Sequence, residues 1–149
     1  MELTWTYKYF NDLSSFELYA IMQLRNAVFV VEQNCIYQDA DGKDLQCWHL
    51  AAWNGTNLVA YCRIMPAGLS YRHPCIGRVL SSPDYRNGGF GRELMQKAVT
   101  KTIHQFANNI IIISAQLYLQ KFYESIGFVK DSDTYLEDNI PHIRMQFGT

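Results

Sequence analysis

The sequence lacks an excess of charge of either sign. Its 149 residues include 13 Lys and Arg and 14 Asp and Glu, a formal net charge of −1. Because no global field attracts phosphate backbones or anionic lipids, we expect neither nucleic acid nor a membrane surface as a partner. Any anion site must be built locally, and a small molecule is the expected partner.

Long apolar runs and an export signal are also missing. The longest aliphatic run in the C-terminal half, at residues 110–113, is far shorter than the roughly 20 residues of a membrane helix. Residues 1–5 show no basic stretch leading into an apolar one. We therefore expect a cytoplasmic protein.

Paired cysteine motifs are absent as well. No two of the four cysteines form a Cys-x-x-Cys pair, which excludes a locally encoded zinc site or redox pair. In a reducing compartment we expect free, partly buried thiols. The cysteines are Cys35, Cys47, Cys62 and Cys75.

Apolar residues are plentiful and follow alternating strand and helix patterns. Hydrophobic residues make up 48% and charged residues 18%, and with no repeat or linker this predicts one globular domain over residues 1–149. Ser14 and Glu17 form a capping box that opens a helix, and Asn54-Gly55 predicts a tight hairpin turn. Strands are expected at residues 5–9, 49–53, 58–64, 76–81, 110–114, 128–130 and 142–147, and later helices at residues 90–105 and 117–126.

The sharpest feature is a glycine-rich turn between the fourth predicted strand and the second helix. Residues 86–92 read Arg-Asn-Gly-Gly-Phe-Gly-Arg. Free N–H groups at a helix start attract anions, glycines let the backbone approach a diphosphate, and Arg86 and Arg92 add positive charge. No Gly-Lys-Ser/Thr follows, so the turn is not a P-loop. Taken alone, it is equally typical of a turn that serves geometry only.

A second motif at residues 122–128, Phe-Tyr-Glu-Ser-Ile-Gly-Phe, follows the buried strand. Together with Arg86, Gly89 and Gly91 it resembles the signature of the GCN5-related N-acetyltransferase (GNAT) superfamily, which has Arg/Gln-x-x-Gly-x-Gly/Ala and a later Phe-Tyr-x-x-x-Gly-Phe. Further short segments look like its ElaA-like subfamily. These lie at residues 24–25, 28–35, 37–39, 41–42, 76–79 and 140–143, with Asp44.

The resemblance implies a mixed α/β, mostly antiparallel twisted sheet of about six or seven strands, splayed between the fourth and fifth and flanked by about four helices. It implies acetyl-CoA as co-substrate, without a metal, and a small-molecule or peptide amine that attacks the thioester directly. The residues implied to hold the coenzyme are Val79, Leu80, Ser81, Arg86, Asn87, Gly88, Gly89, Phe90, Gly91, Arg92, Gln116 and Phe122.

Tyr123 occupies the position of the general acid in many relatives. Its proton transfer to the thiolate is uphill by about 1.5 pKa units, roughly 2 kcal/mol, which a hydrogen bond in the transition state can absorb. The other interpretation is an ordinary tyrosine packed under the sheet. Candidates for the base are Glu32, His49 and His142. Glu32 is the first choice because it follows an apolar stretch, where burial would raise its pKa.

For the acceptor we expect contacts from Arg25, Phe29, His49, Arg78 and His142. Arg25 and Arg63 also flank Asp39, Asp41 and Asp44, and this cluster is similar to one in acyl-homoserine lactone synthases; it either holds a polar acceptor or orders a long loop. Transfer of a longer acyl chain and a non-catalytic CoA sensor remain as alternatives. The aromatic content of 14% leaves rings for an acceptor pocket or a homodimer contact.

Overall fold

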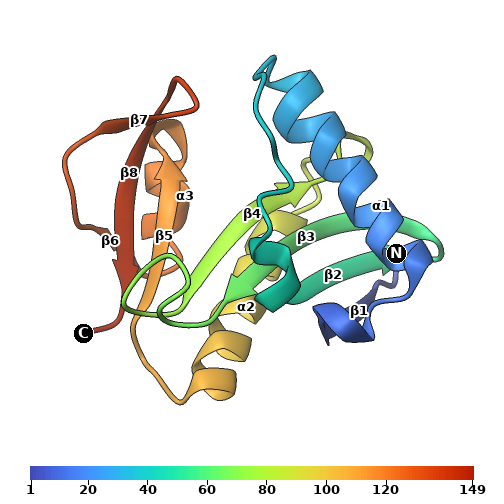
Figure 1. The fold of residues 1–149 in the computed structure, drawn as a ribbon, viewed down its shortest axis with the longest axis horizontal. Helices are drawn as coiled ribbons and strands as arrows, with labels where there is room; N and C mark the ends of the chain where they lie inside the picture. Colours follow the sequence, from blue (N-terminus) through green and yellow to red (C-terminus); the bar gives the residue numbers. More distant parts are fainter.

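The computed structural model describes residues 1–149 as one sheet with helices on both faces (Figure 1). The strand order is β1-β2-β3-β4-β5-β8-β6, and β7 pairs with β8 beside this path. Strands span β1 Thr4–Tyr9, β2 Trp48–Asn54, β3 Asn57–Met65, β4 Cys75–Ser81, β5 Ile111–Gln116, β6 Phe128–Lys130, β7 Tyr135–Glu137 and β8 Ile140–Phe147. The α-helices are α1 Ser15–Arg25, α2 Phe90–Phe106 and α3 Gln120–Glu124. The predicted mixed fold is confirmed, with eight strands and three α-helices.

The strand that the sequence prediction missed is β7, which forms a hairpin with β8. Asp138 and Asn139 connect the two strands with φ of +51° and +63°. Two successive positive φ angles are typical of a type I′ turn, whose twist matches that of paired strands. The turn signal was therefore present in the sequence, although β7 itself is only three residues long.

The first hairpin turns one residue later than predicted. Asn54 pairs with Asn57, so the two central residues are Gly55 and Thr56. Only Gly55 has a positive φ, +61°. This fits a turn with glycine at the first central position, as in type II′, and Asn54 ends β2.

The first helix begins as predicted and then changes its winding. The Ser14 hydroxyl accepts from the Glu17 N–H, and the Glu17 carboxylate accepts from the Ser14 N–H. After Arg25 the chain continues as a π-helix over Asn26–Glu32, a rare geometry that is frequent at functional sites. None of the helices is long and apolar enough to cross a membrane.

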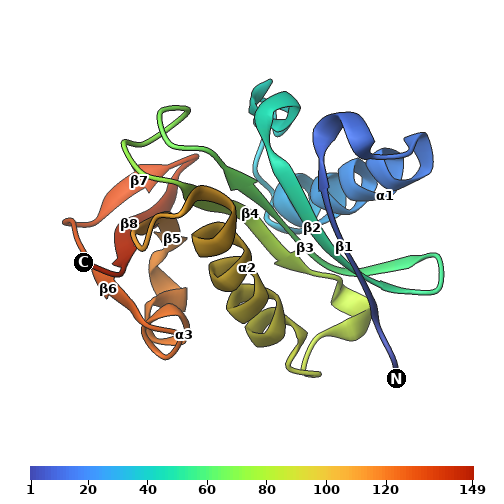
Figure 2. The same cartoon turned by 90° about the horizontal axis from the view of Figure 1, so that it is seen from below.

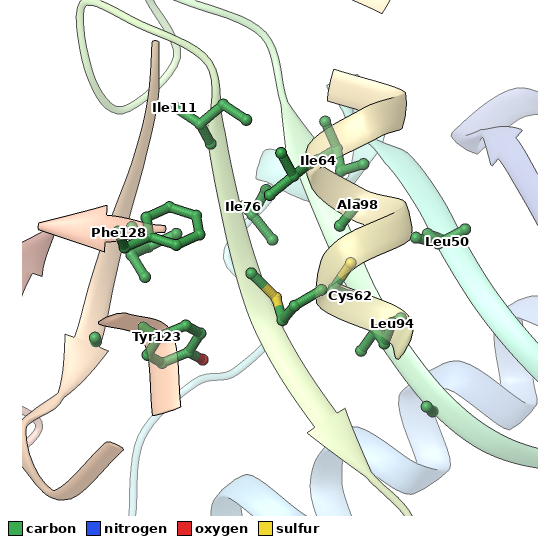
Figure 3. Packing of buried hydrophobic residues seen from close by; sticks show 14 of the residues in the cluster. Leu50, Cys62, Ile64, Ile76, Leu94, Ala98, Ile111, Tyr123 and Phe128 are labelled. Atoms are coloured by element: carbon green, nitrogen blue, oxygen red, sulfur yellow. The ribbon is translucent and has the colours of Figure 1, made fainter. Parts of the chain in front are cut away.

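Two apolar layers bury the two faces of the sheet, and α1 lies on one side of the sheet with α2 and α3 on the other (Figure 2). On one face, Leu94 and Ala98 of α2 pack with strand residues such as Ile64, and Tyr123 of α3 belongs to the same layer (Figure 3). On the other face, Ile21 of α1 packs with a separate set of strand residues. The sheet therefore separates α1 from α2 and α3.

The sheet opens between β4 and β5, as the resemblance implied. These neighbours are parallel and share a single registered pair, Cys75 with Ile112, whereas all other pairings are antiparallel. Beyond that pair the strands diverge (Figure 1). The C-terminal ends of β4 and β5 thus leave room for a ligand within the sheet.

Candidate active site

A cavity of about 1010 Å³ occupies the gap between β4 and β5. Its walls come from both faces of the sheet, with Phe29 from the π-helix and Tyr123 from α3. Because it passes through the sheet, one molecule can be held on the α2 side and a second can approach from the α1 side. Such an arrangement suits a reaction between two substrates.

One end of the cavity meets the start of α2. Gly89 caps the helix with a φ of +78°, and the Glu93 N–H is the first to bond back into the helix, to the Gly89 carbonyl at 3.2 Å. The N–H groups of Phe90, Gly91 and Arg92 consequently have no intrahelical acceptor. A Cβ at Gly88 would lie 2.5 Å from the Phe90 ring, so a larger residue there would have to displace that side chain. These unpaired donors are an anion site of the kind that binds a diphosphate.

The turn residues take different positions around this site. Arg86 and Gly91 line the cavity, as do the predicted residues Gln116 and Phe122. Arg92 instead donates to the Ser125 hydroxyl at 2.8 Å and stacks over Phe122. The remaining predicted turn residues, Asn87, Gly88, Gly89 and Phe90, shape the turn and do not line the cavity.

Glu32 is not the buried base that the sequence suggested. Its side chain is 42% exposed and accepts two hydrogen bonds from Arg86, at 2.8 and 2.6 Å. The hydrogen bonds from Arg86 lower the pKa of the Glu32 carboxyl instead of raising it. The expectation of burial failed because the π-helix leaves Glu32 exposed at the cavity wall, whereas Val28 and Phe29 of the same helix are buried.

The β4 wall carries an irregularity where it meets the cavity. Arg78 has a φ of +51°, which is uncommon for a residue other than glycine, and the register with β3 shifts between Tyr61 and Arg63. This is a β-bulge, a feature that redirects side chains next to active sites. The predicted coenzyme contacts Val79, Leu80 and Ser81 follow the bulge and line the cavity.

Tyr123 faces the cavity from α3 while its ring is held in the core. The residue is 6% exposed and packs edge-on against Phe122 and Phe128. Burial raises the pKa of Tyr123 above its ordinary value, with smaller contributions from Cys62 and Tyr118. The side chain is therefore a neutral phenol that can donate a proton, but its raised pKa makes transfer to a thiolate more uphill than for an ordinary tyrosine.

Comparison with known proteins identifies the fold family. Residues 19–148 match the model of the acetyltransferase (GNAT) domain. The chain belongs to the GNAT family. This membership places it among acyl-CoA-dependent N-acyltransferases.

Relatives of this GNAT chain support the ElaA-like resemblance. Protein ElaA of Escherichia coli K12 is 42% identical over 145 residues, which cover 96% of this chain and 95% of that protein. The crystal structure of Escherichia coli ElaA superposes with a TM-score of 0.93 at 40% identity. That of an acyl-CoA N-acyltransferase from Pseudomonas aeruginosa superposes with a TM-score of 0.94 at 43% identity. Each covers 99% of this chain and 100% of the other chain.

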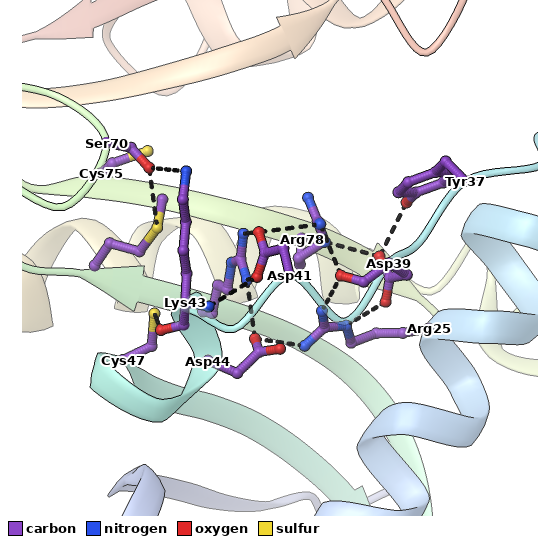
Figure 4. Close-up of polar contacts among 12 residues, drawn as sticks. Arg25, Tyr37, Asp39, Asp41, Lys43, Asp44, Cys47, Ser70, Cys75 and Arg78 are labelled. Carbon is purple, nitrogen blue, oxygen red and sulfur yellow. Dashed lines mark hydrogen bonds and ion pairs between the residues drawn. The ribbon is translucent and has the colours of Figure 1, made fainter.

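The acidic and basic cluster of this GNAT chain is a closed ion-pair network (Figure 4). Arg25 is fully buried and donates to Asp39 at 2.8 Å and to Asp44 at 2.7 Å. Arg63 donates to Asp44 at 2.9 Å and to both carboxylate oxygens of Asp41. Arg78 joins the network at 2.8 Å from Asp39. The network then contains three arginines and three aspartates, so its formal charges balance.

The ion pairs order the loop that carries Asp39, Asp41 and Asp44, and not every residue of the network faces the cavity where an acceptor would bind. Arg25 does not line the cavity, which corrects its predicted role in acceptor contact. Phe29, Arg63 and Arg78 do line it. No group of three or more His, Cys, Asp or Glu side chains lies close enough to hold a metal ion.

His49 also lies outside the cavity, contrary to its predicted contact with the acceptor. It is 1% exposed, and its two ring nitrogens bond the Tyr61 hydroxyl at 2.7 Å and the Asp44 carbonyl at 3.0 Å. Burial lowers the pKa of His49, which keeps the imidazole neutral. Its role is to connect β2 and β3 to the loop that carries Asp44.

His142 lies on the cavity wall opposite Arg78, next to residues that sequence reasoning did not select. It is 6% exposed, and its Nε2 lies 3.4 Å from a carboxylate oxygen of Glu137. Ser114 donates to the other Glu137 oxygen at 3.2 Å. Ser114, Glu137 and His142 all line the cavity. These three residues lie close together because β7 pairs with β8. Since β7 was not predicted from the sequence, Glu137 could not be placed beside His142.

Proposed function

We propose that this protein transfers the acetyl group of acetyl-CoA to a primary amine of a small molecule or peptide. The supporting observation is that one cavity joins the open N–H groups at the start of α2 to the Tyr123 side chain. The diphosphate would lie on the former and the thioester sulfur near the latter. Arg86, once released from Glu32, would pair with the diphosphate. We place the reaction in the cytoplasm, in keeping with four free cysteines.

The chemistry requires a direct attack by the neutral amine on the thioester carbonyl. The new C–N bond forms, the C–S bond breaks, and the leaving thiolate takes the Tyr123 proton. An ammonium loses two protons on becoming an amide: one is released to solvent, and the other replaces the proton given by Tyr123. General acid catalysis of this kind contributes about 10²–10⁴-fold to the rate.

The coenzyme site is tested by thermal shift on wild type, Gly91→Glu and Gly91→Gln. Gly91 lies in helical backbone with only the tip of Phe122 within 4.0 Å of an added Cβ, so both side chains fit. A carboxylate in the first turn favours the helix but repels a diphosphate. CoA at 100 times its dissociation constant stabilises the folded protein by about 2.7 kcal/mol, roughly 5–10 °C in Tm. We expect that shift in wild type and Gly91→Gln, and its loss in Gly91→Glu.

The transfer itself is tested with acetyl-CoA and a panel of primary amines, by thiol release and by the product mass. A product heavier by one acetyl group supports the proposal. Faster turnover with a long-chain acyl-CoA would replace it with the longer-acyl alternative. A Tm shift without any product across the panel would favour a CoA-binding sensor.

A further inference from the structure

We propose that Glu137 and His142 form the site that binds the acceptor as an ammonium ion and removes its first proton, with His142 as the general base. This inference rests on the proposed acetyl transfer and adds its missing proton acceptor.

The tautomer of His142 follows from its contacts. Nδ1 lies 2.6 Å from the Ile140 carbonyl oxygen, which can only accept, so Nδ1 carries a hydrogen. In the neutral ring Nε2 is then an unprotonated acceptor. It lies 3.4 Å from a Glu137 oxygen, which is also an acceptor when ionised. With the ring neutral, these two acceptors lie side by side, and an ammonium group would supply one hydrogen to each.

Glu137 is held in place for this role by a chain of hydroxyl groups. The Tyr135 hydroxyl bonds the Ser114 hydroxyl, which in turn donates to Glu137 Oε1 at 3.2 Å. This leaves Glu137 Oε2 to face His142. Tyr135 also stacks on the His142 ring, with centroids 6.2 Å apart and planes at 22°. Carboxylate and imidazole are thus oriented together, and the carboxylate would stabilise the imidazolium that forms.

No Lys or Arg side chain pairs with Glu137: Arg63 and Arg78 also line the cavity but pair with aspartates, and Lys43 donates to Ser70. Titratable groups beside this part of β8 are Glu137 and Tyr135 on β7 and Tyr118 on the turn after β5, while β5 presents Ser114 and Gln116. Tyr71, in the loop between β3 and β4, also interacts with Ser114, Tyr135 and Glu137. On β8, Arg144 is the nearest cation in sequence, and it is paired with Asp131 at 3.1 Å. An incoming ammonium would therefore meet an unshared negative charge.

The site lies on the side of the cavity where the acceptor must arrive. Gln116 and His142 are directly opposed in the β5–β8 register and so share one face of the sheet. Ala115 and Ile143, their neighbours along each strand, belong to the core on the other face, which also contains Tyr123. The amine and the phenol therefore approach the thioester from opposite sides. His142 takes one proton from the ammonium, and the freed lone pair attacks the carbonyl carbon.

The first test follows His142 directly, with n-butylammonium chloride as the probe. The protein has four histidines, so ¹H–¹³C NMR resolves each Cε1–H signal and the His142→Asn spectrum assigns the one of interest. In CoA-saturated protein we expect butylammonium to shift the His142 signal saturably and to leave that of the exposed His104 in place. Glu137→Gln should weaken this response roughly tenfold. An unmoved His142 signal in protein that binds CoA overturns the inference alone, whereas absence of CoA binding overturns the proposed function and the inference with it.

The second test is kinetic, with the best amine of the panel. His142→Asn keeps a donor for the Ile140 carbonyl but lacks Nε2; we expect kcat/KM to fall by about 10²–10⁴-fold while the CoA dissociation constant is unchanged. The acidic limb of the pH–rate profile should disappear in this variant. An unchanged rate and pH profile in His142→Asn would contradict the role, and His104→Gln serves as the matched control.

Discussion

Arg86 donates two parallel hydrogen bonds to Glu32 at the cavity wall, at 2.6 and 2.8 Å. Arg86 belongs to the turn that would receive the diphosphate, and Glu32 to the π-helix on the other wall. A bound diphosphate would compete with Glu32 for the same guanidinium. On the proposed function, the ion pair would open as the coenzyme binds.

We expect Glu32→Gln to bind CoA about two- to fivefold more tightly, since an exposed ion pair of this kind is weak and its loss frees Arg86. Isothermal titration calorimetry measures the change. Asp131→Asn is the matched control, because it removes the carboxylate of a similarly exposed pair with Arg144, at 3.1 Å. Weaker CoA binding in Glu32→Gln would mean that the carboxylate positions Arg86 for the coenzyme.

Tyr123→Phe should lower kcat by about 10²-fold and leave the fold unchanged. The hydroxyl makes no hydrogen bond to another residue, and phenylalanine preserves the edge-on contacts with Phe122 and Phe128. We therefore expect Tm to change by less than about 2 °C. Stopped-flow thiol release and a melting curve give the two values. Undiminished kcat would assign proton donation to water.

Asp44→Asn should destabilise the protein by about 3–5 kcal/mol, because it leaves a fully buried arginine without one of its two carboxylates. Urea unfolding followed by tryptophan fluorescence measures the loss. In the exposed pair of Arg144, the control Asp131→Asn should lose less than about 1 kcal/mol. Equal losses in both variants would show that the buried network adds nothing beyond a surface pair.

The same network predicts sensitivity to acid. Burial alone would raise the pKa of Asp41 and Asp44, but hydrogen bonds from Arg63 to Asp41 and from Arg25 to Asp44 outweigh it, so both pKa values are lowered. A lowered pKa in the folded state gives stability that is present above the unfolded value of about 3.9 and is lost as pH falls below it. We expect the free energy of unfolding to drop steeply below about pH 4. Denaturant midpoints at several pH values test this, and a flat profile would contradict it.

Much of the fold followed from local sequence signals. The capping box at Ser14 and Glu17 is present, and the strand–turn–helix around Gly89 is as predicted. These features depend on residues within one turn of each other. The failures involved longer-range packing, because a π-helix cannot be read from apolar spacing and leaves Glu32 exposed.

The predictions for the candidate site succeeded or failed for the same reason, local motif against longer-range packing. Motif residues such as Gly91 and Tyr123 line the cavity, since the motif itself specifies the local geometry. His49 was misplaced because an imidazole facing a buried tyrosine has the same sequence signature as one facing a cleft. Glu137 was missed because its position depends on the pairing of the very short β7 with β8.

The single registered pair between β4 and β5 also has a mechanical consequence. Every other neighbouring pair of strands is registered over at least three positions, so the backbone connection between the β1–β4 and β5–β8 portions of the sheet is its weakest seam. Under a pulling force applied across the sheet, rupture should begin there. A molecule that fills the cavity would bridge the seam and raise the force needed to part it.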